Sequence, residues 1–266
     1  YEDERWWDTA AGRNWRLGIG TAAGIHANVR DWVARCRANP ESMDKLKETG
    51  QWDEEQYERG LRRVRMTEAE LDAHLRELYP EQRFTEPQFW RDERFNNPSQ
   101  PVVGLTWYEA RAYCAWLSAQ MAAPMRLPTE VEWEAAARET AARRFAYGDS
   151  FDPLAGNTLE TRLRRPSPVG AFVTGDTPEG LSDMAGNVFE WTSSACGKNF
   201  DVPEFGYPYR ADDGREDPEV AMDVMRVTRG GAWFNGFTRS RAACRIDDLP
   251  DFRNFSCGFR VAASLG

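Results

Sequence analysis

Lysine is nearly absent from this chain of 266 residues, occurring only at positions 45, 47 and 198, so arginine supplies almost all of the positive charge. Lysine and arginine together number 34 against 43 acidic residues, which gives a net charge of −9. Binding to nucleic-acid phosphates requires a basic field, so we expect no nucleic acid as a partner. The arginines at positions 162, 164 and 165 are interpreted as a solvated loop.

Cysteines and long apolar runs are also sparse. The five cysteines, at positions 36, 114, 196, 244 and 257, form no CxxC pair, and their number is odd. This pattern is typical of reduced thiols and predicts a cytoplasmic protein. No apolar run reaches about 18 residues, so we expect no transmembrane segment. The sequence starts at Tyr1 and not at methionine. If an N-terminal leader was removed, the compartment of the protein is unknown.

The chain does contain an unusual stretch at positions 229–261, RGGAWFNGFTRSRAACRIDDLPDFRNFSCGFRV. Glycines and arginines form a regular frame, in which paired glycine permits close backbone approach and arginine offers planar donors. Between them lie residues that follow neither helix nor strand periodicity. These interleaved side chains mix aromatic, acidic, amide and small groups, a composition typical of a binding surface.

The preceding chain predicts a helical region and an α+β core. Positions 26–86 are charged, and Val29, Trp32, Val33 and Cys36 have the spacing of one helix face. We interpret this range as a helical insertion. Thr67, Thr106 and Thr129 are each followed three residues later by Glu, which predicts three capping boxes. The helix after Thr106 should bury one face that consists of Ala110, Tyr113, Cys114 and Leu117.

Composition predicts the local structure of two further ranges. Residues 1–25, with Trp6, Trp7, Trp15 and Leu17 as anchors, are expected to form a first strand region. The density of Gly, Pro, Asp and Asn from position 148 to 199 predicts long irregular loops.

Several blocks in order resemble one family. RGGAW…GFRV follows GLSDMAGNVFEWT and PVVGLTWYEARAYCAWLSAQ…RLPTEVEWEAAAR, which resembles the formylglycine-generating-enzyme (sulfatase-modifying factor) domain. The resemblance covers about positions 87–261. It implies a loop-rich variant of the C-type lectin fold, here one domain over 1–266 with an insertion at 26–86. We expect a bacterial protein that is monomeric.

The catalytic residues of that family do not carry over. Its copper-holding cysteines fall at or near Phe237 and near Phe234 or Asn235, and none of these can supply the thiolate that Cu(I) requires. The iron-dependent branch of the superfamily uses three histidines, whereas this chain has only His26 and His74. We therefore expect no enzyme activity and no copper. A copper-dependent formylglycine-generating oxidase, or another enzyme of the superfamily, remains the alternative.

The sequence is most similar to the variable proteins of diversity-generating retroelements, in which adenine-directed mutation of AAC codons alters the C-terminus of a lectin-like domain. Every interleaved residue is reachable from AAC, and Lys, Glu, Gln, Met and Trp are absent from positions 234–261. The resemblance implies that positions 229–261 are the variable, ligand-binding region, with a protein or other macromolecule as the ligand. The expected binding residues are Phe234, Asn235, Gly236, Phe237, Ile246, Asp247, Asp248, Leu249, Phe252, Asn254, Phe255 and Ser256. A non-diversified sensor or adaptor module remains a further alternative.

The resemblance also implies a structural calcium ion. The family binds calcium at a loop that matches DMAGNVFE, so Asp183 and Glu190 would supply carboxylates, and Gly186 and Val188 backbone carbonyls. Oxygen ligands of this kind suit Ca²⁺. A loop held by hydrogen bonds alone is the alternative.

Overall fold

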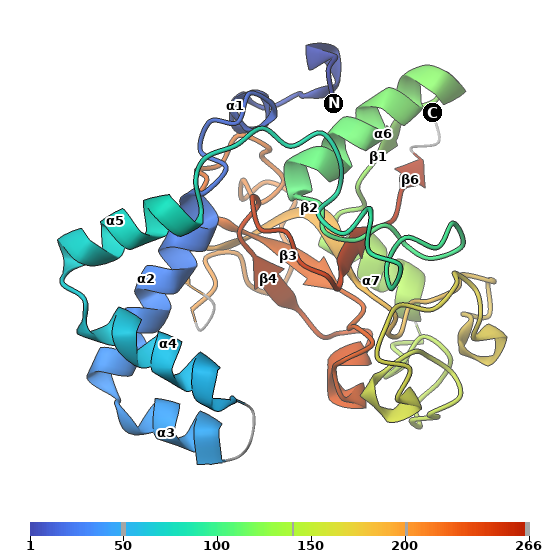
Figure 1. Cartoon of the computed structure of the whole chain (residues 1–266). Helices are drawn as coiled ribbons and strands as arrows, with labels where there is room; N and C mark the ends of the chain where they lie inside the picture. The colour runs from blue at the N-terminus through green and yellow to red at the C-terminus, as the bar shows by residue number, and fades with distance from the viewer. Residues whose placement is uncertain (49–51, 140, 200–201, 264–266) are drawn as a thin grey trace. The chain divides into compact units, whose positions relative to one another are not determined.

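The computed structural model describes residues 1–48, 52–139, 141–199 and 202–263. The chain forms two compact units, which we call the main unit (Tyr1–Leu17 with Phe84–Gly266) and the helical unit (Gly18–Arg83). The described strands all belong to the main unit, and Figure 1 labels β1, β2, β3, β4 and β6. The helical segment expected at 26–86 thus begins and ends several residues earlier.

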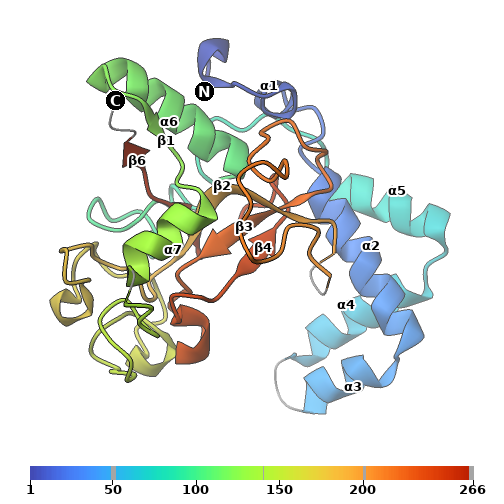
Figure 2. The same ribbon diagram turned by 180° about the vertical axis from the view of Figure 1, so that it is seen from behind.

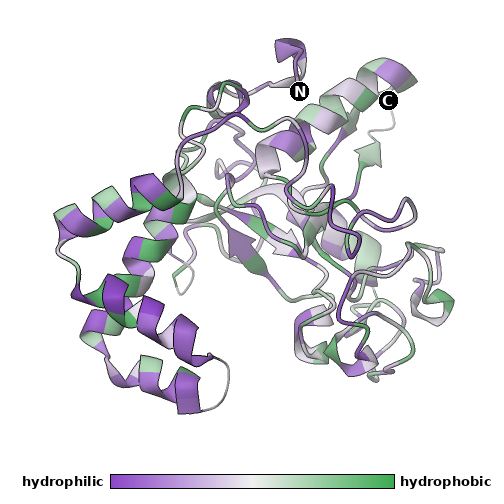
Figure 3. Cartoon of the chain, viewed as in Figure 1, coloured by the Kyte–Doolittle hydropathy of each residue, from purple (hydrophilic) through white to green (hydrophobic). Residues whose placement is uncertain are grey.

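Four helices make up the helical unit: α2 (Ala23–Ala38), α3 (Glu41–Glu48), α4 (Glu54–Arg65) and α5 (Glu68–Leu78). Its core consists of Val33, Leu71 and Leu75, with Val29 and Trp32 packed against them. This confirms the helix face expected from the 29–36 spacing. Figure 3 shows mainly hydrophilic residues along α3 and α4.

The three capping boxes are confirmed. The hydroxyls of Thr67, Thr106 and Thr129 accept from the backbone N–H three residues on, and the Glu there accepts from the threonine N–H. A fourth box, formed by Asp53 with Gln56, begins α4. These side chains satisfy backbone donors that a helix start leaves unpaired.

The main unit is built around a four-stranded sheet in the order β4-β3-β2-β5. Its strands are β2 (Phe189–Gly197), β3 (Met225–Arg229), β4 (Ile246–Asp248) and β5 (Cys257–Phe259). Strand β3 is antiparallel to both β2 and β4, whereas β5 runs parallel to β2. A second antiparallel pair joins β1 (Met125–Arg126) to β6 (Ala262–Ala263).

Helices α1 (Ala10–Arg16), α6 (Trp107–Met121) and α7 (Glu130–Arg138) accompany this sheet. Helix α7 packs against β2 and β3 and lies in front of them in Figure 2. Short 3₁₀ turns complete the unit: η1 (Glu4–Trp6), η2 (Leu159–Thr161), η3 (Val173–Gly175) and η4 (Phe237–Ser240). The arrangement confirms the predicted α+β class.

Buried indole rings and their hydrogen bonds hold α6 against the sheet. Trp107 and Trp191 are fully buried in one hydrophobic core. The Trp107 Nε1 donates to the carbonyl of Thr192 at 2.8 Å, and the Trp191 Nε1 donates to the carbonyl of Leu105 at 3.2 Å. The guanidinium of Arg226 lies 3.9 Å from the centre of the Trp107 ring. Large rings with satisfied N–H groups thus replace the aliphatic packing of a more regular fold.

Four local expectations were wrong. The first residues form η1 and α1 and no strand, because the Thr9 side chain caps a helix by accepting from Gly12 N–H. Leu17, an expected anchor, is exposed. Strand β2 lies inside the range expected to be irregular, since eight of its nine residues are buried and composition does not reveal burial. Tyr113, expected on the buried face of α6, is 45% exposed.

Candidate functional site

The frame arginines of the C-terminal stretch form ion pairs with glutamates of distant elements. Arg245 donates from Nε to Oε2 of Glu130 at 2.7 Å, and Arg253 pairs with Glu109. Because Glu109 and Glu130 lie in the first turns of α6 and α7, both helix starts are joined to the C-terminal loops. Arg245 and Arg253 also donate to loop carbonyls, those of Phe205 and Glu86. These bonds hold the C-terminal loops against the two helix starts.

Five aromatic rings gather where the C-terminal stretch meets the loops before α6. This aromatic cluster consists of Phe89, Phe95, Trp233, Phe234 and Phe255. The Phe255 ring centre lies 5.4 Å from that of Phe234 and 5.6 Å from that of Trp233. Phe255 is the exposed member, at 38%. An aromatic group held in this way offers contact area with little side-chain entropy to lose on binding.

The other expected binding residues divide into different surroundings. Phe237 stacks on Phe151, with 4.6 Å between the ring centres, and also approaches Phe145. Neither of these two partners belongs to the aromatic cluster. Strand β4 holds Ile246, which packs against the main core. The half-buried members are Phe234, Asn235, Gly236, Phe237, Ile246, Asp248, Leu249, Phe252 and Asn254.

Two expected binding residues are buried, so their placement on an exposed face is wrong. Asp247 is 9% exposed and Ser256 is fully buried. The Ser256 N–H and hydroxyl both donate to Oδ1 of Asn254, at 3.1 and 2.8 Å. Asn254 and Ser256 thus close a turn with each other, a role in backbone geometry that sequence variability does not reveal.

The β4 carboxylates lie in a poorly solvated environment. Burial raises the pKa of Asp248 to about 7, and the neighbouring charge of Asp247 contributes. Burial also raises the pKa of Asp247, whose neighbours include the Cys196 thiol and Arg245. An incoming cationic group would stabilise the ionised form of either carboxylate.

The loop expected to bind calcium surrounds an existing ion pair. Arg260 donates from Nε to Oε2 of Glu190 at 2.5 Å and from Nη2 to Oε1 at 2.7 Å, and Trp133 Nε1 donates to Oε2 at 2.6 Å. Asp183, at φ 58°, accepts from Gly170 N–H at 2.8 Å. Burial raises the pKa of Asp183, and the Glu190 charge raises it further.

These residues fit a calcium ion only in part. A cation would relieve the repulsion between Asp183 and Glu190, but Arg260 already compensates Glu190. If each carboxylate binds through one oxygen, Asp183 and Glu190 with the carbonyls of Gly186 and Val188 provide fewer oxygens than the roughly six to eight that Ca²⁺ takes, so water would have to complete the shell. Within the described ranges, no three His, Cys, Asp or Glu side chains gather as a metal site.

Three of the five cysteines are buried thiols with raised pKa values. All five are free, and burial raises the pKa of Cys114 and of Cys196 to about 12 and raises that of Cys257 as well. Buried thiols of this kind are poor metal ligands and poor nucleophiles. His26 Nε2 lies within 3.1 Å of the carbonyls of Leu75 and Tyr79, so it is engaged inside the helical unit.

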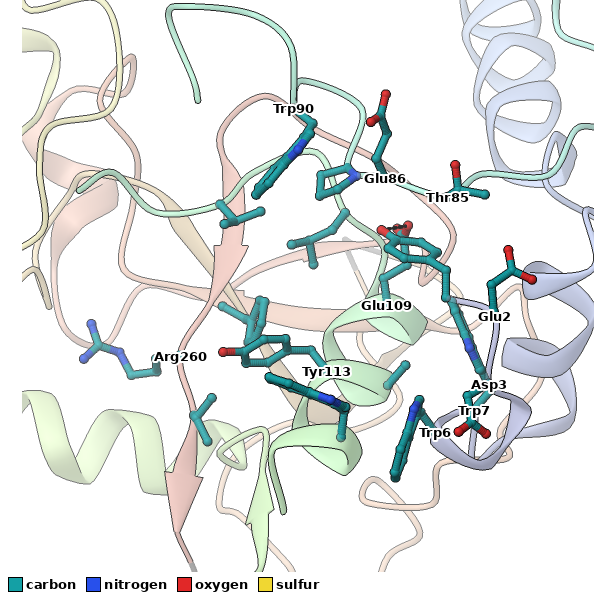
Figure 4. Close-up of a pocket in the computed structure, with 18 residues that line it drawn as sticks. Glu2, Asp3, Trp6, Trp7, Thr85, Glu86, Trp90, Glu109, Tyr113 and Arg260 are labelled. Carbon is teal, nitrogen blue, oxygen red and sulfur yellow. Dashed lines mark hydrogen bonds between the residues drawn. The ribbon is translucent and has the colours of Figure 1, made fainter. Parts of the chain in front are cut away.

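The main unit also contains a cavity that was not expected from the sequence. Its volume is about 990 Å³, and none of the twelve expected binding residues lines it. Its walls include Trp6, Trp7, Trp90, Tyr113 and Trp116 (Figure 4). The sequence offered only the helical spacing of the aromatic residues Tyr113 and Trp116, which the structure shows to be 45% and 40% exposed on α6.

The sequence of this chain is similar to that of several known proteins. Residues 53–265 match the family model described as Sulfatase-modifying factor enzyme 1-like domain. Hercynine oxygenase of Mycolicibacterium thermoresistibile is 34% identical over 196 residues, which cover 67% of this chain and 41% of that protein. The Inactive C-alpha-formylglycine-generating enzyme 2 of Bos taurus is 34% identical over 182 residues, which cover 62% of this chain and 51% of that protein.

Among solved structures, Treponema denticola variable protein 1 superposes with a TM-score of 0.50 at 21% identity, covering 67% of this chain and 75% of that one. This likeness concerns the fold, and the expected formylglycine-generating-enzyme variant of the C-type lectin fold is confirmed. The chain spans about two-fifths to one-half of the two curated relatives. In the part of the chain that the structure describes, no helix has the length and apolarity needed to cross a bilayer.

Proposed function

Because the chain belongs to the family of sulfatase-modifying factor enzyme 1-like domains, we propose that it uses this scaffold to bind a macromolecular ligand without the oxidase chemistry of the family. The observation that carries the proposal is the aromatic cluster around Phe255. Its exposed ring stands on a loop fixed by the pairing of Arg253 with Glu109. Rigid aromatic anchors beside polar groups are the composition of binding hot spots.

The loss of chemistry follows from residue types. Phe237, together with Phe234 or Asn235, occupies the places that the resemblance assigns to copper-binding thiolates. Cys257, one of the two cysteines nearest in sequence, does not substitute in its present state, because it is buried with a raised pKa. An inactive formylglycine-generating enzyme among the relatives is consistent with such a loss.

The origin of the surface is part of the proposal. The interleaved residues fit the outcome of adenine-directed mutation in AAC codons, and the exposed Phe255 and half-buried Phe234 and Phe252 fit a surface open to such change. Asp247 and Ser256 limit it, because large substitutions there would enter buried space. We expect the domain to act as a monomer in a reducing compartment, which its five free thiols suit.

The relatives that are enzymes favour a second candidate. Hercynine oxygenase is 34% identical to this chain, so an enzymatic role of a longer protein is the competing hypothesis. A three-histidine iron site would need a ligand beyond His26 and His74, which both lie in the helical unit. Such a role would require histidines from outside the 266 residues.

The flanking DNA tests the retroelement origin. We expect a near-copy of the 3′ end of the gene, with adenines at the codons of the variable positions, beside a reverse transcriptase gene. A genome without this copy would contradict diversification and leave a lectin-fold binding module. A separate selection for binding tests the module itself: libraries that vary Phe234, Phe252 and Phe255 should yield binders, whereas libraries that vary Arg245 and Arg253 should lose folded protein.

A further inference from the structure

The cavity near α6 is lined mainly by aromatic and aliphatic side chains, as small-molecule sites are. Tyr113 forms the centre of a contacting aromatic group, with its ring centre 5.5 Å from that of Trp116 and 5.4 Å from that of Phe259. Aliphatic side chains of Val102, Leu105 and other residues continue this surface. The volume of about 990 Å³ suits a drug-sized compound and exceeds what a single ring would fill. Exposed aromatic residues of this density on one surface are uncommon unless they bind something.

One buried donor in the wall has no acceptor. Trp7 is 3% exposed and lines the cavity, and its Nε1 finds no hydrogen-bond partner among the described residues. An unsatisfied buried N–H is costly, and most such groups in proteins are paired. Because the Nε1 atom is itself covered, a ligand that displaces part of this wall and brings an acceptor oxygen to the indole would satisfy it.

The wall of the cavity contains the charged residues Glu2, Asp3, Glu86, Glu109 and Arg260, and ion pairs compensate the last four. Asp3 receives the guanidinium of Arg5, with Nη2 2.5 Å from Oδ2, and Glu86 receives Arg91, with Nε 2.9 Å from Oε1. Glu109, buried in the wall, is paired with Arg253.

The cationic residue in the lining is compensated as well. Arg260 is engaged by Glu190, and Figure 4 shows its side chain directed away from the other labelled residues. Each of these four ionised groups thus has an oppositely charged partner, so full charge is not what the cavity selects. Its aromatic walls and the Trp7 donor remain as the selecting features.

From these observations we propose that the cavity binds a neutral, mainly aromatic small molecule that carries a hydrogen-bond acceptor for the Trp7 N–H. The ligand stacks against Tyr113, Trp116 and Phe259. This site is separate from the surface around Phe255, so it goes beyond the proposed macromolecular binding and can succeed or fail independently of it.

A matched series of naphthalene probes tests the proposal on the whole chain. In calorimetric titrations, 2-acetylnaphthalene should bind with a dissociation constant on the order of 0.1 mM. We expect 2-ethylnaphthalene, which lacks the carbonyl, to bind about five-fold more weakly, the effect of one neutral hydrogen bond. The trimethyl(2-naphthylmethyl)ammonium cation and the 2-naphthoate anion should bind more weakly than the ketone. Preference for either ion by about ten-fold or more would overturn the neutral-ligand assignment.

Substitutions locate the binding. Tyr113→Ala and Trp116→Ala should each weaken binding of both neutral probes by about ten-fold or more, because each removes one stacking wall. Met121→Ala is the matched control, since Met121 is exposed on the same helix and does not line the cavity. Trp7→Phe keeps a ring and removes the N–H, so it should abolish the preference for the ketone while leaving 2-ethylnaphthalene unaffected.

Two results would overturn the site. One is the absence of binding by every neutral probe up to its solubility limit. The other is unchanged affinity in the Tyr113→Ala and Trp116→Ala proteins. If Trp7→Phe does not fold, these two exposed positions still decide the location, and the difference between the ketone and 2-ethylnaphthalene on the unaltered protein still decides the acceptor.

Discussion

Arg253 and Glu109 form a buried ion pair between the C-terminal loop and the first turn of α6. The Arg253 Nε lies 3.2 Å from Oε2 of Glu109, and the two side chains are only 7% and 4% exposed. Glu109 also accepts from Thr106 N–H at 2.6 Å as part of the capping box. One carboxylate therefore begins the helix and positions the loop that carries Phe255.

Arg253→Ala should destabilise the protein by about 3–5 kcal/mol, because it leaves the buried carboxylate of Glu109 uncompensated. Chemical denaturation followed by tryptophan fluorescence would measure the loss. Arg5→Ala is the matched control, since Arg5 pairs with Asp3 at the surface and its removal should leave stability unchanged. Equal stability of the two variants would contradict the role given to Arg253.

Neighbouring positions in the C-terminal loop should differ in tolerance. Phe255→Ala removes a ring that is 38% exposed, so we expect a loss of about 1 kcal/mol, less than for a fully buried side chain. Ser256→Phe places a large ring where the hydroxyl is buried and bonded to Asn254, and should cost about 3 kcal/mol or more. Thermal unfolding of both variants checks this order. A Ser256→Phe protein as stable as the parent would show that burial does not limit variation there.

The raised pKa of Asp248 predicts that the free energy of unfolding depends on pH. Its pKa is raised to about 7 from an ordinary value of 3.8, so the folded state holds the proton more tightly than the unfolded state does. Stability from this group is therefore present at low pH and is lost as the pH rises from about 4 to about 7, by at most about 4 kcal/mol.

Asp248→Asn should remove this contribution to the pH dependence. At pH 8 the variant should be more stable than the parent by about 1–2 kcal/mol, because no charge is buried, and the difference should shrink toward pH 4. Urea unfolding at several pH values gives the comparison. Asp212→Asn, an exposed carboxylate in a weak pair with Arg210, is the control. Parallel pH profiles of the parent and Asp248→Asn would contradict the assignment.

Calcium should raise the melting temperature if the Asp183–Glu190 loop binds it. We expect a modest rise in millimolar calcium, since few protein oxygens are available and Arg260 competes for Glu190. Asp183→Asn should reduce the rise, whereas Asp212→Asn should not. A melting temperature that does not change with calcium would mean that the Arg260 ion pair fastens the loop without an ion.

Copper should not confer cysteine oxidation. With Cu(I), oxygen and a cysteine-containing sulfatase-type peptide, mass spectrometry should find no aldehyde above background. The reason is that phenylalanine and asparagine stand at the assigned ligand positions, and they bind Cu(I) poorly. Turnover that disappears in Cys244→Ser or Cys257→Ser would show that the copper ligands had been placed wrongly.

Local sequence determined much of the fold. Each capping box needs only residues three apart, so Thr67, Thr106 and Thr129 could be assigned without any tertiary information. The motifs around positions 183–191 and 229–261 indicated the family and its fold. The aromatic residues at 234 and 255 also indicated a binding surface, because their types and spacing fit no regular element.

Only the tertiary structure decided which side chains remain accessible. Asp247 and Ser256 look like their variable neighbours in sequence, but sheet pairing and a closed turn bury them. Tyr113 has the spacing of a buried residue on α6, yet it lines a cavity with Phe259 from a strand 146 positions later. Accessibility depends on what distant segments cover, and no local pattern records that contact.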